Sequence, residues 1–259
     1  MNKSILTEKE ANLMETIVIR YGSVVSFDQI YELLKKEHSR DYIREIVSKS
    51  VKNGWFIRIK KSLYIISDLF NRGNTTFPQY ILANLIVRNS YVSFGQALQY
   101  HGMFDQLIKT TTSISLTRYK TIELLGFQYR YINTQEKYFF GWEEVVYQGQ
   151  TTKIALPEKA LIDTVQFSRS NISVDMVIEK ITEFKDQINF IRLNEYLSKS
   201  PIAVQKIFGF ILDLLGIESG EILKMLNKND SRVYLVRGSN NYNSKWNVYY
   251  DDIFKRYQK

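Results

Sequence analysis

The stretch SRDYIREIVSKSVKNGWFIRIKKSLYII, residues 39–66, decides the fold of the first part of this chain. Ser39 is a typical helix N-cap, and the apolar residues after it recur at helical spacing until Gly54 ends the helix. The residues after the glycine predict two short strands joined by a basic turn. A helix followed by such a hairpin is the closing half of a winged helix-turn-helix, a fold that presents both elements to DNA.

Two further helices are predicted before this stretch. Thr7 and Glu10 form the T-x-x-E pattern of a capping box, which predicts a first helix over residues 7–20. Ser26 is the expected N-cap of the second helix, in SFDQIYELLKK. The order of three helices and a hairpin assigns residues 1–70 to a winged helix-turn-helix domain.

Positive charge concentrates where this domain would meet DNA. The whole chain carries a formal net charge of +8, and residues 38–64 hold seven Lys or Arg against two acids, a local balance of 7 − 2 = +5. Basic side chains neutralise phosphates, so we expect a DNA partner. The predicted contacts are Ser39, Arg40, Tyr42, Arg44, Ser48 and Lys52 on the third helix, and Arg58, Lys60 and Lys61 on the wing.

Two points about this surface stay open at the level of sequence. Arg40 and Arg44 are placed to read base edges or to hold phosphates, and the pattern does not separate the two roles. The same charges also suit the solvated face of a protein-interaction module. The order of the elements, their caps and the basic hairpin favour DNA.

The remaining residues predict a second, larger domain. A polar segment with Gly73 and Pro78, residues 67–78, marks the boundary, and the second domain is assigned to 76–259. Its patterns predict helices over 79–88 and 93–100, a β-rich region over 111–156 with strands in TSISL, FQYRYI, KYFF and TKIAL, a helical region over 157–228, and a terminal β-hairpin over 232–250 whose strands flank GSNNYNS. The expected fold class is α+β, a winged helix-turn-helix followed by a mixed α/β domain.

Composition bears on several kinds of chemistry. The chain has no Cys and two His, His38 and His101, so a zinc site or a Cys-His dyad has no ligand set, and we expect no metal and no cofactor. His101 is expected to end a helix with its ring hydrogen-bonded. No run approaches the ~20 apolar residues of a membrane span, and the first residues carry no apolar signal core. These patterns predict a cytoplasmic protein without a membrane partner.

Two sets of polar residues suggest a nuclease centre and a second nucleic-acid surface, and we favour neither interpretation. Glu158, Lys159 and Asp163 faintly suggest a nuclease centre, but a helix-end glutamate and an i,i+4 ion pair explain them better, so we expect no enzyme. Arg118, Lys120 and Arg130, interleaved with tyrosines, would extend a track for DNA or RNA, or simply guard a sheet edge; we favour the edge.

Two blocks of the second region carry a family resemblance. YVSFGQALQYHG at 91–102 and IALPEKALIDTV at 154–165, placed after a winged helix, resemble the AbiEi antitoxins of the bacterial AbiE toxin-antitoxin systems, which act in abortive infection. The resemblance spans most of residues 7–169. It implies a repressor of its own operon that acts at inverted repeats. It also implies neutralisation of a cognate nucleotidyltransferase-like toxin, AbiEii, without a stable complex, through the C-terminal domain.

The sequence thus predicts an antitoxin and DNA-binding autorepressor. One winged helix makes few contacts, so specificity would need two copies on an inverted repeat. Whether the chain dimerises in solution or pairs only on DNA stays open. The alternatives are a ligand-sensing winged-helix regulator and, with less support, a winged-helix nuclease.

Overall fold

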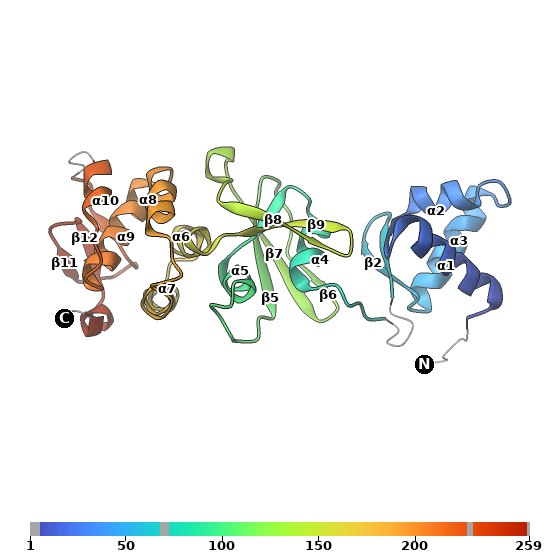
Figure 1. The fold of residues 1–259 in the computed structure, drawn as a ribbon, viewed down its shortest axis with the longest axis horizontal. Helices are drawn as coiled ribbons and strands as arrows, with labels where there is room; N and C mark the ends of the chain where they lie inside the picture. Colours follow the sequence, from blue (N-terminus) through green and yellow to red (C-terminus); the bar gives the residue numbers. More distant parts are fainter. Residues whose placement is uncertain (1–5, 68–72, 227–229, 258–259) are drawn as a thin grey trace. The chain divides into compact units, whose positions relative to one another are not determined.

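The structure is a computed structural model that describes residues 6–67, 73–226 and 230–257. It is mixed α+β, a helical N-terminal region followed by a larger α/β region, as the sequence predicts (Figure 1). The chain divides into two compact units. The first contains the described residues up to Arg88 with Glu123–Phe127 and Val145–Thr152, and the second contains Asn89–Ile122, Gln128–Glu144 and the described residues from Lys153 onward.

Three helices and a three-stranded sheet form the beginning of the first unit. The helices are α1 (Glu8–Tyr21), α2 (Phe27–Leu34) and α3 (Arg40–Lys52), and the strands are β1 (Val24–Ser26), β2 (Phe56–Lys60) and β3 (Leu63–Ile66). The N-caps are the predicted ones: Thr7 and Ser26 form full capping boxes, and the Ser39 hydroxyl accepts from the Tyr42 amide. The sheet order is β1-β3-β2, with antiparallel pairs.

The three helices meet around isoleucines. Ile17, Ile30 and Ile43, one from each helix, have no exposed surface and share a cluster with Val25 and Phe56 of the sheet. Burying a side chain of this size is worth about 1.5–3 kcal/mol. These contacts fix α3 against the wing. The sequence did not predict β1, because three residues are too short to show a strand period.

The boundary predicted at residues 67–78 falls within the first unit, and its residues 68–72 lie outside the described part of the chain. Helix α4 (Gln79–Ile86) follows, with Pro78 as its N-cap. The first unit therefore extends past the residue at which the sequence placed the end of the winged helix.

A six-stranded sheet occupies the β-rich region. Its strands are β4 (Ser90–Val92), β5 (Thr110–Ser115), β6 (Ile122–Leu124), β7 (Phe127–Asn133), β8 (Trp142–Tyr147) and β9 (Gln150–Ala155), in the order β6-β7-β5-β4-β9-β8. Strand β4 is antiparallel to β5 and parallel to β9, and β5 is parallel to β7. Helix α5 (Phe94–Tyr100) follows β4 and contacts β5.

The strand predicted in KYFF is wrong. Residues 136–138 form the 3-10 turn η1 (Glu136–Tyr138), and the strand begins later, at Trp142. The aromatic rings explain the error, because Phe139 packs on the Tyr91 ring at 5.1 Å and Phe140 on the Tyr196 ring at 5.4 Å. Two adjacent residues that both pack inward give an apolar run without the alternation of a strand.

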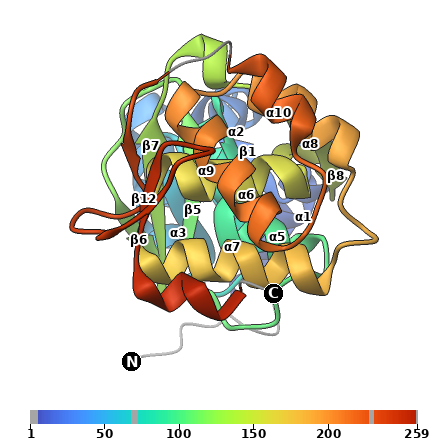
Figure 2. The ribbon, with the colours of Figure 1, turned by 90° about the vertical axis from the view of Figure 1, so that its left-hand side faces the viewer.

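Five helices form the predicted helical region: α6 (Pro157–Phe167), α7 (Asn171–Glu183), α8 (Phe190–Ser198), α9 (Ile202–Leu214) and α10 (Gly220–Met225). Helix α6 is central, since α5, α7, α8 and α9 all contact it (Figure 2). It is buried on nearly all sides, its charged residues Glu158, Lys159 and Asp163 included. No helix in the described part of the chain combines the length and apolarity needed to cross a membrane.

The predicted hairpin over 232–250 is only partly correct. The structure has three short strands, β10 (Val233–Tyr234), β11 (Asn241–Asn243) and β12 (Val248–Tyr250), followed by the 3-10 segment η2 (Asp252–Tyr257). Strand β10 pairs parallel with β12. The antiparallel partner of β12 is β11, which lies inside GSNNYNS, the segment that the sequence placed between the two predicted strands. Asn241 and Asn243 carry no apolar pattern, so their backbone pairing left no sequence signal.

Candidate nucleic-acid interface

A groove runs between α3 and the wing in the first unit. Its volume is about 620 Å³. It is lined by Phe27, Asp28, Arg40, Arg44, Val47, Ser48, Val51, Lys52, Arg58, Lys61, Ser62 and Tyr64. Six of the nine predicted DNA contacts are in this lining: Arg40, Arg44, Ser48, Lys52, Arg58 and Lys61. The fold thus brings together residues that are up to 21 positions apart in the sequence, from Arg40 to Lys61.

The far wall of the groove is the wing, and backbone bonds hold it in place. The Phe27 amide, the first residue of α2, donates to the Ser62 carbonyl at 2.9 Å. Strand β3 pairs on both edges, with β1 and with β2. Ser62 sits in the left-handed region, with φ 59°, at the turn between β2 and β3. The wing turn is therefore fixed relative to the helices and not a free loop.

The groove lining is strongly basic. It carries five cations against one acid, Asp28, a balance of 5 − 1 = +4. The Arg40 guanidinium stacks over the Tyr31 ring at 5.1 Å and lies 3.9 Å from Asp28. Arg44 pairs with Asp41 at 2.8 Å. Exposed pairs of this kind contribute about 0–1 kcal/mol, so a phosphate can replace the acid at little cost.

The remaining two residues predicted on α3 lie at its start, outside the groove lining. The Ser39 hydroxyl caps the helix by accepting from the Tyr42 amide at 3.3 Å. The Tyr42 side chain is half exposed, and its ring centroid lies 4.8 Å from that of His38. The first amides of a helix attract anions. The Ser39 hydroxyl is used in the cap, so an anion at this end of α3 would meet backbone amides and not this side chain.

Lys60 is placed differently from the prediction. Its Nζ donates to the Ile86 carbonyl at 3.0 Å, the last residue of α4. Burial, together with nearby Arg88, lowers the pKa of Lys60 from its ordinary value. A cation at the carbonyl end of a helix stabilises that end. We therefore correct the assignment: Lys60 contacts α4, and of the two lysines at the wing turn it is Lys61 that lines the groove.

The second predicted basic set, Arg118, Lys120 and Arg130, is exposed in the second unit. Among the tyrosines interleaved with these cations, Tyr119 is 37% exposed and the other two are buried. Tyr129 and Tyr131 are buried in the sheet, and burial raises the pKa of both phenols. The predicted sheet edge is wrong, because Arg130 lies on β7, which pairs with β6 and β5, and Arg118 and Lys120 lie in the segment between β5 and β6.

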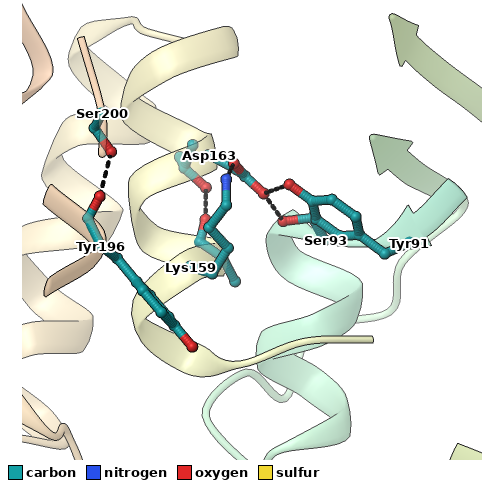
Figure 3. A network of polar contacts seen from close by, with 8 residues as sticks. Tyr91, Ser93, Lys159, Asp163, Tyr196 and Ser200 are labelled. Atoms are coloured by element: carbon teal, nitrogen blue, oxygen red, sulfur yellow. Dashed lines mark hydrogen bonds and ion pairs between the residues drawn. The ribbon is translucent and has the colours of Figure 1, made fainter. Parts of the chain in front are cut away.

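Lys159 and Asp163 form a buried ion pair at the heart of the second unit (Figure 3). The other oxygen of the Asp163 carboxylate accepts from the Ser93 hydroxyl at 2.7 Å and the Tyr91 hydroxyl at 3.0 Å. Burial raises the pKa of Asp163, while the Lys159 ammonium and the two hydroxyls oppose that rise. The i,i+4 pair was expected from the sequence; its complete burial was not.

Glu158 is also fully buried, and its carboxylate contacts the start of helix α8. It accepts two bonds from the Arg192 guanidinium, at 2.8 and 3.0 Å, and one from the Asn189 amide at 2.7 Å. Its carboxylate thus caps α8 instead of facing a substrate. Among the described residues, no group of three or more His, Asp or Glu side chains is arranged to hold a metal ion.

His101 has the role predicted for it. It is the C-cap residue of α5, and its ring Nε2 lies 2.9 Å from the Ala155 carbonyl. That contact ties α5 to the last residue of β9. The His101 ring therefore has a hydrogen-bond partner within the fold.

Comparisons with known proteins give a fold likeness and no family. No protein-family model matches the chain, and no curated protein matches it. The crystal structure of the RV2827C protein from Mycobacterium tuberculosis is similar, with a TM-score of 0.64 and 12% identity, over 94% of this chain and 92% of that chain. At this identity the likeness concerns the fold alone, and it extends over both units.

Proposed function

We propose that the chain is a DNA-binding transcriptional autorepressor and the antitoxin of a toxin-antitoxin operon. The observation that supports the DNA-binding half is the groove, which gathers five cations and Ser48 from α3 and the wing. Such a protein would work in the cytoplasm, where its operator lies.

In this proposal α3 enters the major groove of the operator. Arg40, Arg44 and Ser48 lie on its exposed side, and Arg44 needs only to leave Asp41 to reach a base edge or phosphate. Arg58 and Lys61 hold the flanking phosphates from the wing. Two copies on an inverted repeat would double the small contact area of one domain.

The antitoxin half rests on the resemblance to the AbiEi antitoxins. It assigns neutralisation of a nucleotidyltransferase-like toxin to the second unit, without a stable complex. The blocks that carry the resemblance form α5, β9 and α6, the packed centre of that unit. The toxin-directed surface would therefore lie on the elements around this centre.

The test of DNA binding is a gel shift of the full chain on its own upstream DNA, with scrambled DNA as competitor, at several salt concentrations. We expect a specific shift that weakens as salt rises. Lys61→Ala should weaken binding to all sequences and reduce the slope of log K against log salt by about 0.9, the value of one lost phosphate contact.

The neighbouring lysine provides a matched control. Lys60→Ala removes the same charge from a residue that binds Ile86, so the salt slope should stay at the wild-type value. Lys9→Ala, on the exposed surface of α1 and outside the groove lining, is a second control. Equal slopes for all four proteins would remove the wing from the interface. No specific shift at low salt would refute the repressor.

A further inference from the structure

The C-terminal sheet of the second unit carries a row of tyrosines on one face. Tyr234, Tyr249 and Tyr242 come from β10, β12 and β11, and the register pairs Tyr249 with both of the others. The rings of Tyr234 and Tyr249 are stacked, with centroids 4.6 Å apart and planes 10° from parallel. Tyr242 continues the row at 4.8 Å from Tyr249.

This face is not the one that packs in the core. Val233, Val248 and Tyr250 of the same strands are buried, and β10 and β12 contact α9. Tyr234 and Tyr242 at the two ends of the row remain 49% and 42% exposed. Cross-strand aromatic pairs stabilise a sheet, which accounts for the stacking. It does not account for exposing the outer rings.

A hollow opens beside the Tyr234 end of the row. Its volume is about 400 Å³, and Tyr234 lines it together with Arg169, Val236, Arg237 and Gly238. This volume lies within the range of about 300–1,000 Å³ typical of sites for small ligands. A flat ring that enters the hollow would therefore meet an aromatic surface that is already part of a stack.

The charge around the hollow is positive. Within the described part of the chain, the side chains of Arg169 and Arg237 have no acidic partner. A third arginine, Arg232, lies 5.9 Å from the centre of the Tyr242 ring, at the other end of the row. Aromatic rings interleaved with arginines are the combination that binds bases by stacking and phosphates by charge.

We propose that this tyrosine face binds single-stranded RNA. One base stacks on Tyr234 in the hollow and lengthens the existing row, while Arg169 and Arg237 contact the phosphates on either side. Paired bases are already stacked on both faces, so only unpaired bases can bind in this way. In cells RNA displays such bases in loops and single-stranded stretches. This inference does not depend on DNA binding by the winged helix.

The test is fluorescence anisotropy of the full chain with a labelled, unstructured RNA of about 12 nucleotides, a length within the range covered by known stacking sites. Tyr234→Ala should weaken binding at least about fivefold, because stacking on an aromatic ring contributes this much or more per base. Tyr234→Phe keeps the ring and should bind as wild type. Arg237→Ala should weaken binding and lower the salt slope by about 0.7, the value for one contact on a single strand.

Two comparisons separate this site from the proposed DNA interface. Tyr42→Ala removes an equally exposed tyrosine from α3 and should leave RNA affinity unchanged. Conversely, Tyr234→Ala should leave the operator gel shift unchanged. Circular dichroism verifies that each variant is folded.

Several outcomes would overturn the inference while leaving the repressor proposal intact. These are no RNA binding in low salt, equal binding by Tyr234→Ala and wild type, or equal binding of duplex RNA. A DNA strand of the same sequence bound as tightly as the RNA would overturn the assignment to RNA.

Discussion

Lys159 and Asp163 belong to a segment, PEKALIDTV, that is easily mistaken for chemistry. In the folded chain neither side chain reaches solvent, and the Asp163 carboxylate is fully bonded by Lys159, Ser93 and Tyr91. A buried pair is costly to break from one side, because the remaining charge has no partner. The pair was predictable from its spacing of four. Its burial was not, since it depends on Tyr91 and Ser93, some 70 residues away.

Asp163→Ala should lower the free energy of unfolding by about 3–5 kcal/mol, because it strands the Lys159 ammonium in the core. The double variant Lys159→Met/Asp163→Leu should lose less than Asp163→Ala alone, since no charge is left unpaired. Urea denaturation of these proteins and of Lys159→Met completes the comparison. A double variant as unstable as the sum of its parts would mean that the ion pair does not set the stability of this core.

The elements show which local signals survive in the folded protein. The caps at Thr7, Ser26 and Ser39 were predictable because a helix cap depends on residues within one turn of each other in the sequence. Strands β1 and β11 were not, because each has three residues; β1 also pairs with a strand distant in the sequence, and β11 has no apolar alternation. The local sequence also does not explain Gly209, which lies in the middle of α9, where glycine is unfavourable.

The structure explains Gly209 by its contact with Trp246. A Cβ at this position would lie 2.2 Å from the indole ring, which packs directly on the helix backbone. The indole Nε1 donates to Asp213 at 2.7 Å, one helical turn further along α9. These two contacts seat the C-terminal sheet on the helix.

Gly209→Ala should therefore destabilise the protein by about 1–3 kcal/mol, in spite of a helix propensity gain of about 1 kcal/mol. Thermal or urea unfolding measures the loss. The control is Gly209→Ala made in a Trp246→Leu background. There the indole is absent, so adding the alanine methyl should cost much less. A stabilising Gly209→Ala in the wild-type background would contradict the close packing.

At the scale of the whole molecule, the order of helices and strands was largely predictable and the grouping into units was not. The winged helix, the β-rich region and the helical region all occur where the sequence placed them. The first unit nevertheless takes in Glu123–Phe127 and Val145–Thr152, which the linear order assigns to the second. Most residues of the candidate site were predictable from their positive charge and from the face of the third helix on which they lie. Their gathering in one groove required the wing to fold back beside α3.

The proposed division of labour between the units gives a prediction for the intact chain. Arg44→Ala/Lys61→Ala should abolish repression of a reporter placed behind the operator and leave toxin neutralisation intact, because both residues lie in the winged-helix groove. Reporter activity and growth rescue, measured in the same cells, check the two halves. Loss of rescue with normal protein levels would place toxin neutralisation on the DNA-binding surface. Repression retained by the variant would exclude the groove.

Lys60 and Lys61 are chemically identical neighbours, yet Lys60 binds the Ile86 carbonyl and Lys61 lines the groove. Under natural variation the two positions should diverge. Position 61 needs only a positive charge, so arginine would serve equally well there. Position 60 needs a long chain that reaches one carbonyl oxygen on α4, and a shorter side chain would lose that bond while the backbone bonds of the wing remain. The two lysines are therefore expected to follow separate substitution histories, one governed by the partner's phosphates and the other by the protein's own backbone.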